Sequence, residues 1–379
     1  MGETIVIAGA LAQRPGYGGH TWVFLQYLLG FRRLGFDVVF ADWLSEEMCG
    51  GPVRESEGAR YLRTVMEQFG LGGDYALLDE RGDSVAGIDR AGLRDRLARS
   101  SFLLNVMGYL GDEELLAAAS RRVFLDIDPG FPQMWRALGL ADPFAGHDVF
   151  VTIGENVGRP DCPIPTCGID WVRTRQPLVL DLWPEQGSTG GRFTTVGSWR
   201  GAYGPIEWDG RTYGLRVHEF RKFVELPDLS GLQFEIALDI DAAETRDLDL
   251  LRAHGWALAD PGRVACDPVV YQRYVAGSKA EFVVAKNLYV DTRSGWFSDR
   301  SACYLASGKP VVAQDTGLDG LYPLGEGLVT FRTVDEAAAA VHEIAGDYGR
   351  HARAARELAE AYFDSDLVLA NLVDAVEAA

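Results

Sequence analysis

Residues 4–43 read TIVIAGALAQRPGYGGHTWVFLQYLLGFRRLGFDVVFADW, and this stretch decides the fold. Its first seven residues, TIVIAGA, form a continuous apolar and β-branched run, which is typical of a strand buried on both faces. Residues 20–34 are apolar over most of a helical surface, and Gly35 favours a helix end there. Residues 36–43, FDVVFADW, resume the strand pattern. The stretch therefore predicts a complete βαβ unit of a parallel sheet.

The alternation of strand and helix patterns continues through both halves of the chain. The first half carries the strand patterns YALLD, FLLNVMG, RVFLDID and DVFVTIG, and the second carries RFTTVGSW, QFEIALDI, AEFVVAK and KPVVAQDTG. Proline, glycine and polar residues cluster between positions 160 and 192, which indicates a domain boundary. The pattern predicts an α/β fold of two Rossmann-like domains, residues 1–170 and 190–350, facing a central cleft.

The composition of the chain disfavours some classes of binding partner. The chain has 379 residues and a formal net charge of -19, which argues against nucleic acid or an anionic membrane as the main partner. The N-terminal apolar run is too short to span a membrane and has no basic segment before it, so we expect a soluble cytoplasmic protein. The five scattered cysteines are typical of reduced thiols and supply no second pair for a structural metal.

A glycine-rich loop, RPGYGGH, connects the first strand to the first helix. Gly18 and Gly19 allow a ligand to approach the backbone closely, and His20 is expected at the start of the helix, facing the cleft. A histidine there can act as a general base near neutral pH, or it only caps or packs the helix start. The spacing is not G-x-G-x-x-G, and Asp42 is only a weak counterpart of the acid that binds ribose in dinucleotide sites.

Polar residues also follow other strands of the first half. Asp126 and Asp128 lie at the end of RVFLDID, where a carboxylate can orient His20 and stabilise its imidazolium. The following Pro-Gly is equally a turn signal, which gives at least one of the two a purely structural interpretation. Three further residues near strand ends are candidates for contact with an acceptor: Asn105, Glu155 and Asn156.

Strand ends of the second half carry groups suited to a phosphate. Gly197 permits close backbone approach, and Arg200 can bind a phosphate with its planar fork or remain an exposed loop arginine. A helix that begins near residue 298 presents free backbone N–H groups, which form an anion site. The residues expected around this site are Gly295, Asp299, Arg300 and Ser301. At the end of the next strand, sugar hydroxyls could be bound by Gln314, Asp315 and Thr316.

Two stretches carry a resemblance to the GT-B glycosyltransferases. Residues 302–317, ACYLASGKPVVAQDTG, resemble the helix, Gly-Lys-Pro step, strand and sugar-contacting loop of that family. Residues 16–40, GYGGHTWVFLQYLLGFRRLGFDVVF, resemble its first βαβ unit with the acceptor-side loop. The resemblance implies a nucleotide-sugar donor held by residues 190–350 and an acceptor held by residues 1–170. It also implies that helices in residues 351–379 cross back to the first domain, and that catalysis needs no metal or other cofactor.

The sequence also departs from this family in its motifs. Many retaining members carry two glutamates across this helix, and Gly295 and Cys303 stand at those places here. The histidine-rich donor signature of many inverting members is absent too. His20 matches in position the base of inverting members, so the hypothesis is an inverting glycosyltransferase that acts on a hydroxyl of a small molecule or glycan.

Three other functions remain open at this point. The chain could be a GT-B sugar-nucleotide epimerase, a nicotinamide-dependent oxidoreductase, or a partner protein that binds a sugar nucleotide without turnover. Its richness in Ala, Gly and Arg is compatible with a GC-rich bacterial source and with natural-product or glycan biosynthesis. The side chains do not identify the donor base, the sugar, the acceptor or the oligomeric state.

Overall fold

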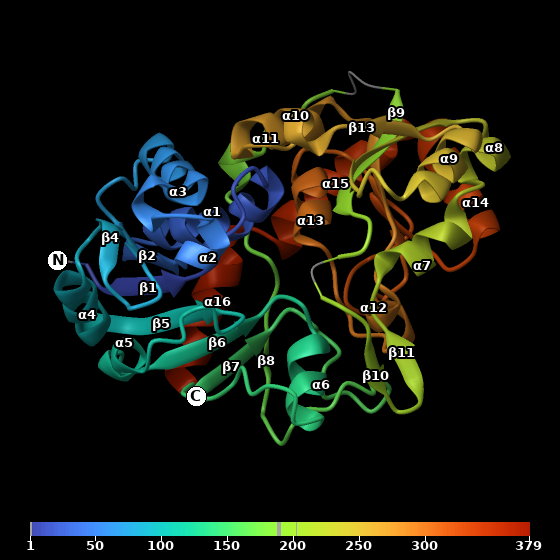
Figure 1. Cartoon of the computed structure of the whole chain (residues 1–379). Coiled ribbons are helices and arrows are strands. Elements are labelled where there is room, and N and C mark those ends of the chain that lie inside the picture. Colours follow the sequence, from blue (N-terminus) through green and yellow to red (C-terminus); the bar gives the residue numbers. More distant parts are fainter. Residues whose placement is uncertain (1, 188–190, 202) are drawn as a thin grey trace.

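The computed structural model describes residues 2–187, 191–201 and 203–379 (Figure 1). The first half folds around a sheet with the strand order β4-β3-β2-β1-β5-β6-β7-β8, parallel except for the β3–β4 pair. Its strands are β1 (Thr4–Ala8), β2 (Asp37–Trp43), β3 (Tyr75–Leu78), β4 (Ser84–Gly87), β5 (Ser100–Val106), β6 (Arg122–Asp126), β7 (Val149–Thr152) and β8 (Val172–Arg173). The predicted βαβ unit is present, with Ile5 opposite Val38 and Ile7 opposite Phe40 in the β1–β2 ladder.

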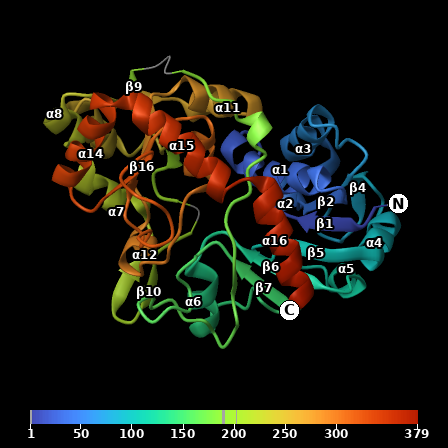
Figure 2. The same ribbon diagram turned by 180° about the vertical axis from the view of Figure 1, so that it is seen from behind.

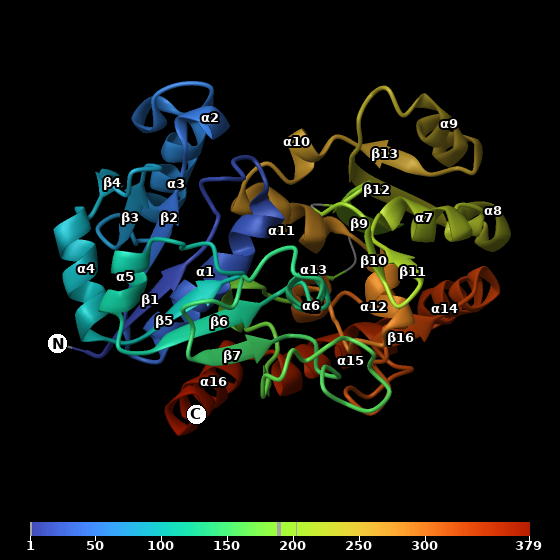
Figure 3. The ribbon, with the colours of Figure 1, turned by 60° about the horizontal axis from the view of Figure 1, so that its bottom comes forward.

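Helices cover both faces of this sheet. They are α1 (Gly18–Arg33), α2 (Glu46–Cys49), α3 (Glu57–Gln68), α4 (Arg90–Arg99), α5 (Glu113–Ala118) and α6 (Phe131–Ala137). Helix α1 is buried on several sides because it packs against the sheet, α11 (Pro268–Gly277) and α16 (Ser365–Ala378). Figure 3 shows α11 beside α1, between the two sheets. This position explains why the helix is apolar over most of its surface.

The second half folds around a parallel sheet with the order β13-β12-β9-β14-β15-β16. Its strands are β9 (Arg192–Ser198), β12 (Gln233–Asp239), β13 (Ala257–Ala259), β14 (Ala280–Val283), β15 (Val311–Gln314) and β16 (Leu328–Phe331). A hairpin that the sequence did not predict, β10 (Ile206–Trp208) and β11 (Arg211–Tyr213), follows β9 and packs near α6 of the first half. The remaining helices are α7 (Arg216–Phe220), α8 (Leu226–Ser230), α9 (Thr245–Ala253), α10 (Pro261–Val264), α12 (Asn287–Asp291), α13 (Asp299–Ala306), α14 (Val334–Gly346) and α15 (Tyr348–Tyr362).

The chain crosses between the domains twice, and the two crossings lie side by side. The Leu178 N–H donates to the Phe363 carbonyl at 2.6 Å, and the Ser365 N–H donates to the Leu178 carbonyl at 2.8 Å. Beyond this point α16 packs on α1, while α15 stays with the second domain against α13 (Figure 2). The expected return of the C-terminal helices is therefore confirmed, and α16 is the helix that makes it.

The observed sheet limits refine the expected domains. Strand β8 belongs to the first sheet, so that sheet ends slightly beyond residue 170. Strand β9 opens the second sheet at Arg192, and the expected boundary at residue 190 lies outside the described residues. In each sheet the first strand, β1 or β9, stands where the strand order reverses. Ligands of such sheets bind outside the carboxyl ends of the strands at this point.

Candidate functional site

A cleft of about 810 Å³ opens between the two sheets, at the carboxyl ends of their strands. Its walls come from the loops after β1, β5 and β6 in the first domain and after β9, β12 and β14 in the second. Four cationic and three acidic side chains line it: Arg14, Arg216, Lys286, Arg300, Asp128, Asp239 and Asp299. The cleft therefore carries a small excess of positive charge, in a chain whose net charge is -19. Local cations of this kind favour an anionic ligand.

Asp42 anchors the loop that follows β1. It is buried at the end of β2, where it accepts hydrogen bonds from the Ala12 N–H at 2.6 Å and the Gln13 amide at 3.0 Å. Burial raises the pKa of Asp42 to about 7, although these hydrogen bonds lower it. Its carboxylate faces the loop, so it does not serve as the ribose-binding acid of a dinucleotide site.

The glycines of this loop bring the two domains together. The Gly18 N–H donates to the Ala265 carbonyl at 2.7 Å, and a Cβ at Gly18 would lie 2.2 Å from the Asp267 carbonyl oxygen. The Trp22 indole donates to the Pro268 carbonyl at 2.8 Å. Gly18 was expected to contact an acceptor, and that expectation is corrected because the second domain occupies the space beside it. Gly19 still lines the cleft.

His20 lines the cleft at the start of α1. Its Nε2 hydrogen-bonds with the Ala10 carbonyl at 3.1 Å, and its ring packs edge-on against Phe24. A carbonyl only accepts, so Nε2 carries the proton and Nδ1 is left as an acceptor in the neutral ring. Burial, and then the charge of Arg14, lower the pKa of His20 to about 4, although the bond to Ala10 raises it. The imidazole is therefore neutral at pH 7.

Asp126 and Asp128 contact groups other than His20. Asp126 accepts hydrogen bonds from Gln133 at 2.7 Å and Thr152 at 2.8 Å, and burial raises its pKa to about 6. It thus fixes the start of α6, as the turn interpretation expected. Asp128 lines the cleft and pairs with Lys286 at 2.8 Å. Among the described residues neither carboxylate hydrogen-bonds to His20, so the predicted dyad is corrected.

Lys286 joins the two domains across the cleft. Besides its ion pair with Asp128, its Nζ lies 4.8 Å from the ring centre of Phe131 and 5.6 Å from that of Tyr203. The Tyr289 hydroxyl also donates to Asp128. Burial lowers the pKa of Lys286 and the Asp128 carboxylate raises it. Sequence reasoning missed this lysine, although its position directly after a strand was a usable signal.

Arg216 is the second residue that sequence reasoning missed. It begins α7, and Gly197 makes room for it, since a Cβ at Gly197 would lie 2.3 Å from the Arg216 Nη1. Within the described ranges its side chain makes one long hydrogen bond, from Nη1 to the Ser198 carbonyl at 3.4 Å, and its enclosed Nε has no partner there. Burial lowers the pKa of Arg216 to about 10. The β10–β11 hairpin separates Arg216 from β9 in the sequence, which hid its place beside that strand.

The predicted anion site at the start of α13 is only partly open to the cleft. Asp299 and Arg300 line the cleft, whereas Ser301 is buried away from it. Arg300 hydrogen-bonds to Glu281 and to the Val196 carbonyl. Burial lowers its pKa, but the combined effect of Glu281, Tyr271 and Asp299 raises it above the ordinary value. Arg200 is exposed, pairs with Glu244 and lies in a shallow groove beside the cleft.

Several other predicted ligand residues instead join the domains. The Asn156 side chain donates to the carbonyls of Arg293 and Gly317, both at 2.8 Å. A Cβ at Gly295 would lie 2.9 Å from the Asn156 main-chain nitrogen, which explains the glycine there. Glu155 pairs with Arg175 at 2.8 Å and accepts from a tyrosine of the second domain. These residues contribute to the domain interface and do not line the cleft, so their predicted contact with a ligand has no support among the described residues.

The last predicted contacts are engaged within their own domains. Gln314 donates to Glu219 at 2.9 Å, and Asp315 pairs with Arg332 at 2.6 Å. The Thr316 hydroxyl donates to a backbone carbonyl. In the first domain, Asn105 hydrogen-bonds to the backbone of Leu110 and to His147. The side chains Asn105, Gln314, Asp315 and Thr316 do not line the cleft in the part of the chain that the structure describes, so their predicted contacts with a ligand stay predictions.

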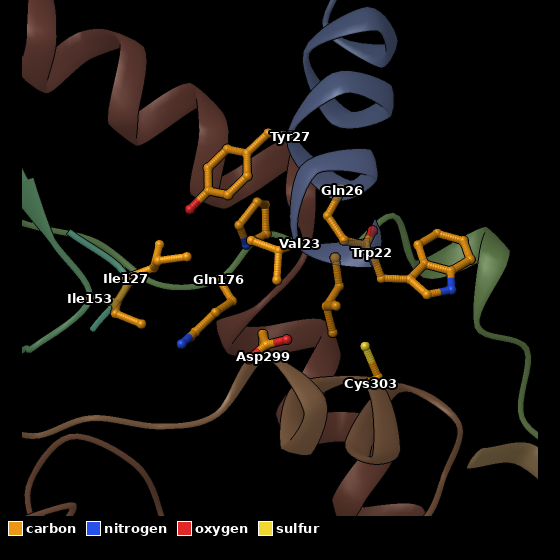
Figure 4. A pocket seen from close by; sticks show the side chains of 11 residues that line it. Trp22, Val23, Gln26, Tyr27, Ile127, Ile153, Gln176, Asp299 and Cys303 are labelled. Atoms are coloured by element: carbon orange, nitrogen blue, oxygen red, sulfur yellow. The ribbon is translucent and has the colours of Figure 1, made fainter. Parts of the chain in front are cut away.

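A small cavity of about 40 Å³ lies beside the floor of the cleft (Figure 4). Asp299, Val23 and Ile127 line both spaces, so the cavity adjoins the cleft. Figure 4 shows Asp299 and Cys303 on α13, across the cavity from α1, which carries Tyr27. The Tyr27 hydroxyl is buried and has no protein partner among the described residues, and burial raises the pKa of Asp299. The cavity is lined mainly by apolar side chains, and Asp299 is the acidic group that reaches it.

None of the helices among the described residues is long and apolar enough to cross a membrane. In the same residues, no group of three or more His, Cys, Asp or Glu side chains is arranged to hold a metal ion.

Solved structures match the chain over its whole length. An alpha-glucosyltransferase in complex with UDP has 11% sequence identity and a TM-score of 0.56, and the match covers 100% of both chains. Anabaena Alr3699/HepE in complex with UDP and glucose has 11% identity and a TM-score of 0.57, again over 100% of both chains. Sucrose-phosphate synthase from Thermosynechococcus elongatus has 12% identity and a TM-score of 0.55 over 99% of both chains. No family profile and no curated protein sequence matches the chain. The likeness confirms the predicted fold, the two Rossmann-like domains of the GT-B type.

Proposed function

We propose that this protein is a glycosyltransferase that moves a sugar from a nucleoside-diphosphate sugar to a hydroxyl group of an acceptor. The observation that carries the proposal is Arg216, a guanidinium without a carboxylate partner in the described ranges, at the topological switch point of the second sheet. The GT-B fold supports the same assignment by analogy. UDP accompanies two of the matching proteins in their structures, so uracil is the first donor base to test.

The diphosphate would lie against the loop after β9. Gly197 leaves the strand end open there, and Arg216 offers planar N–H donors suited to phosphate oxygens. Desolvating a guanidinium is unfavourable, and a diphosphate would supply the missing counter-charge. The same cations would stabilise the negative charge that develops on the leaving diphosphate.

Acceptor activation would belong to His20. A neutral imidazole with Nδ1 free can take the proton of an acceptor hydroxyl. The hydroxyl oxygen forms a bond to the anomeric carbon, the bond from that carbon to the diphosphate oxygen breaks, and the proton passes to Nδ1. Such a single displacement inverts the anomeric centre. The low pKa of His20 makes it a weak base. The acceptor oxygen therefore has to gain positive charge, through its forming bond to the anomeric carbon, before its proton moves to His20.

A ligand panel tests the donor assignment. Thermal unfolding is recorded with UDP, GDP, dTDP, ADP, CMP and NAD, each with and without magnesium. A ligand that binds only the native state raises the free energy of unfolding, by about 2.7 kcal/mol when its concentration is a hundred times its Kd. The melting temperature rises accordingly. We expect one nucleoside diphosphate to give this rise. No rise with any diphosphate, or a rise with NAD alone, would exclude the proposal.

A further inference from the structure

The geometry points to a second anion subsite, on the acceptor side of the cleft, which binds a carboxylate or phosphate group of the acceptor through Arg14. This inference rests on the proposed function, because it assigns the chemical class of the acceptor. The substrate would be a hydroxyl compound that carries its negative charge near the hydroxyl presented to His20. The subsite belongs to the first domain and is separate from the diphosphate position beside Arg216.

Arg14 is held in place by the loop that carries it. The Arg14 N–H donates to the Leu11 carbonyl at 3.2 Å. The two residues before Arg14 are held by the Asp42 carboxylate, which accepts from the Ala12 N–H and from the Gln13 side-chain amide. The side chain is exposed, and it lines the cleft together with Tyr17 and His20. A guanidinium on an anchored loop loses less freedom on binding than one on a mobile loop.

The carboxylates of the cleft are engaged with other groups or lie elsewhere. Asp128 pairs with Lys286, and Asp239 accepts from the Tyr17 hydroxyl at 3.0 Å. Asp299 lies at the floor, beside the small cavity. Arg14 forms no ion pair within the described residues, in a chain with 55 acidic against 36 basic side chains. A cation that stays unpaired in such an acidic chain, inside a cleft, is available to a ligand.

The surroundings of Arg14 suit an anion attached to an organic body. Tyr109 from the first domain and Tyr203 from the second line the cleft near it, and Tyr203 packs edge-on against Trp135 at 4.9 Å. Burial raises the pKa of both tyrosines, while the charge of Arg14 lowers it. The Tyr203 hydroxyl donates to that of Tyr109, which leaves the Tyr109 hydroxyl as the donor for an anion, and both rings offer an apolar face to the rest of the acceptor.

The experiment measures anion binding with the donor position filled. Protein saturated with UDP is titrated calorimetrically with three probes of similar shape: 4-hydroxybenzoate, 4-hydroxyphenyl phosphate and neutral 4-hydroxybenzamide. We expect one or both anions to bind at least about tenfold more tightly than the amide, since charge-assisted hydrogen bonds to arginine are the strong ones. The carboxylate and phosphate arms decide which anion the site prefers. Equal binding of all three probes, or no binding, overturns the proposal.

Variants assign the effect to the residue. Arg14→Gln should abolish the preference for the anion, Arg14→Lys should retain part of it, and Arg54→Gln, at an exposed arginine outside the cleft, should leave it unchanged. UDP affinity should be the same in all of them. A preference that survives Arg14→Gln overturns the assignment. If wild-type protein fails to bind UDP or any other nucleoside diphosphate, the proposed function fails, and the same titrations without nucleotide still decide whether Arg14 binds anions.

Discussion

Replacing Arg216 by methionine should stabilise the free protein and weaken nucleotide binding at the same time. The lowering of the Arg216 pKa to about 10 means that folding costs about 3 kcal/mol for desolvating this charge, at 1.4 kcal/mol per pKa unit. Methionine keeps an apolar stem that reaches as far as the Nε position of arginine, and it removes that cost. It also loses the 3.4 Å hydrogen bond to the Ser198 carbonyl, which contributes about 1 kcal/mol at most. The net gain is about 2 kcal/mol.

The sign of this effect does not change with pH in the usual range. Below about pH 9 the guanidinium is protonated in both the folded and the unfolded chain, so the cost of burying it is constant. The unliganded variant should therefore melt roughly 4–8 °C above wild type at both pH 6 and pH 8, using 2–4 °C per kcal/mol. Affinity for UDP should fall about a hundredfold, because charge-assisted hydrogen bonds to phosphate contribute roughly 1.5–3 kcal/mol.

The assay combines calorimetric melting with titration of UDP. Arg216→Lys is the control for charge, since it keeps a cation and should show neither the full stabilisation nor the full loss of affinity. Arg200→Met is the control for position, because Arg200 is paired with Glu244 in the groove beside the cleft. If Arg216→Met lowers the melting temperature, or if UDP binds it as tightly as wild type, the interpretation of Arg216 as an unpaired ligand cation is wrong.

Three further predictions concern other charged groups. Asp42→Asn should stabilise the protein by about 2–3 kcal/mol more at pH 8 than at pH 5. The folded pKa of about 7 exceeds the unfolded value, so the free energy of unfolding of the wild type falls as pH rises from about 4 to 7. Urea unfolding of both proteins at the two pH values measures the difference. Glu155→Gln should lower the free energy of unfolding by about 2 kcal/mol by leaving the charge of Arg175 unpaired at the domain interface, and an unchanged urea midpoint would contradict this. His20→Asn should lower kcat at least about a hundredfold with unchanged UDP affinity. The kcat/KM of the wild type, which reports the free enzyme, should fall on the acid side only towards pH 4, and an acid limb near pH 6.5 would refute the neutral, low-pKa imidazole.

The order of elements was readable because hydrophobic period and glycine placement are local properties of the chain. The run TIVIAGA gave β1 (Thr4–Ala8), and the apolar segment that stops at Gly35 gave α1 (Gly18–Arg33). The short hairpin after β9 was missed, because its strands of three residues carry no periodic signal. The hairpin lies between β9 and Arg216 in the sequence, although Arg216 is adjacent to Gly197 of β9 in space. Arg216 was therefore not recognised as a residue of the site.

The sequence by itself determined two parallel sheets, their order along the chain, and a cleft at their carboxyl ends, because these follow from patterns within a few residues. It also located His20 and Gly197 at that cleft. Only the tertiary structure decided which polar side chains are free. The Asn156 amide nitrogen and the carboxylates of Glu155 and Asp126 form hydrogen bonds within the protein. Arg14 and Arg216, in contrast, lack acidic partners within the described chain. A partner from another domain leaves no local mark, and burial decides whether a charge is satisfied or left for a ligand.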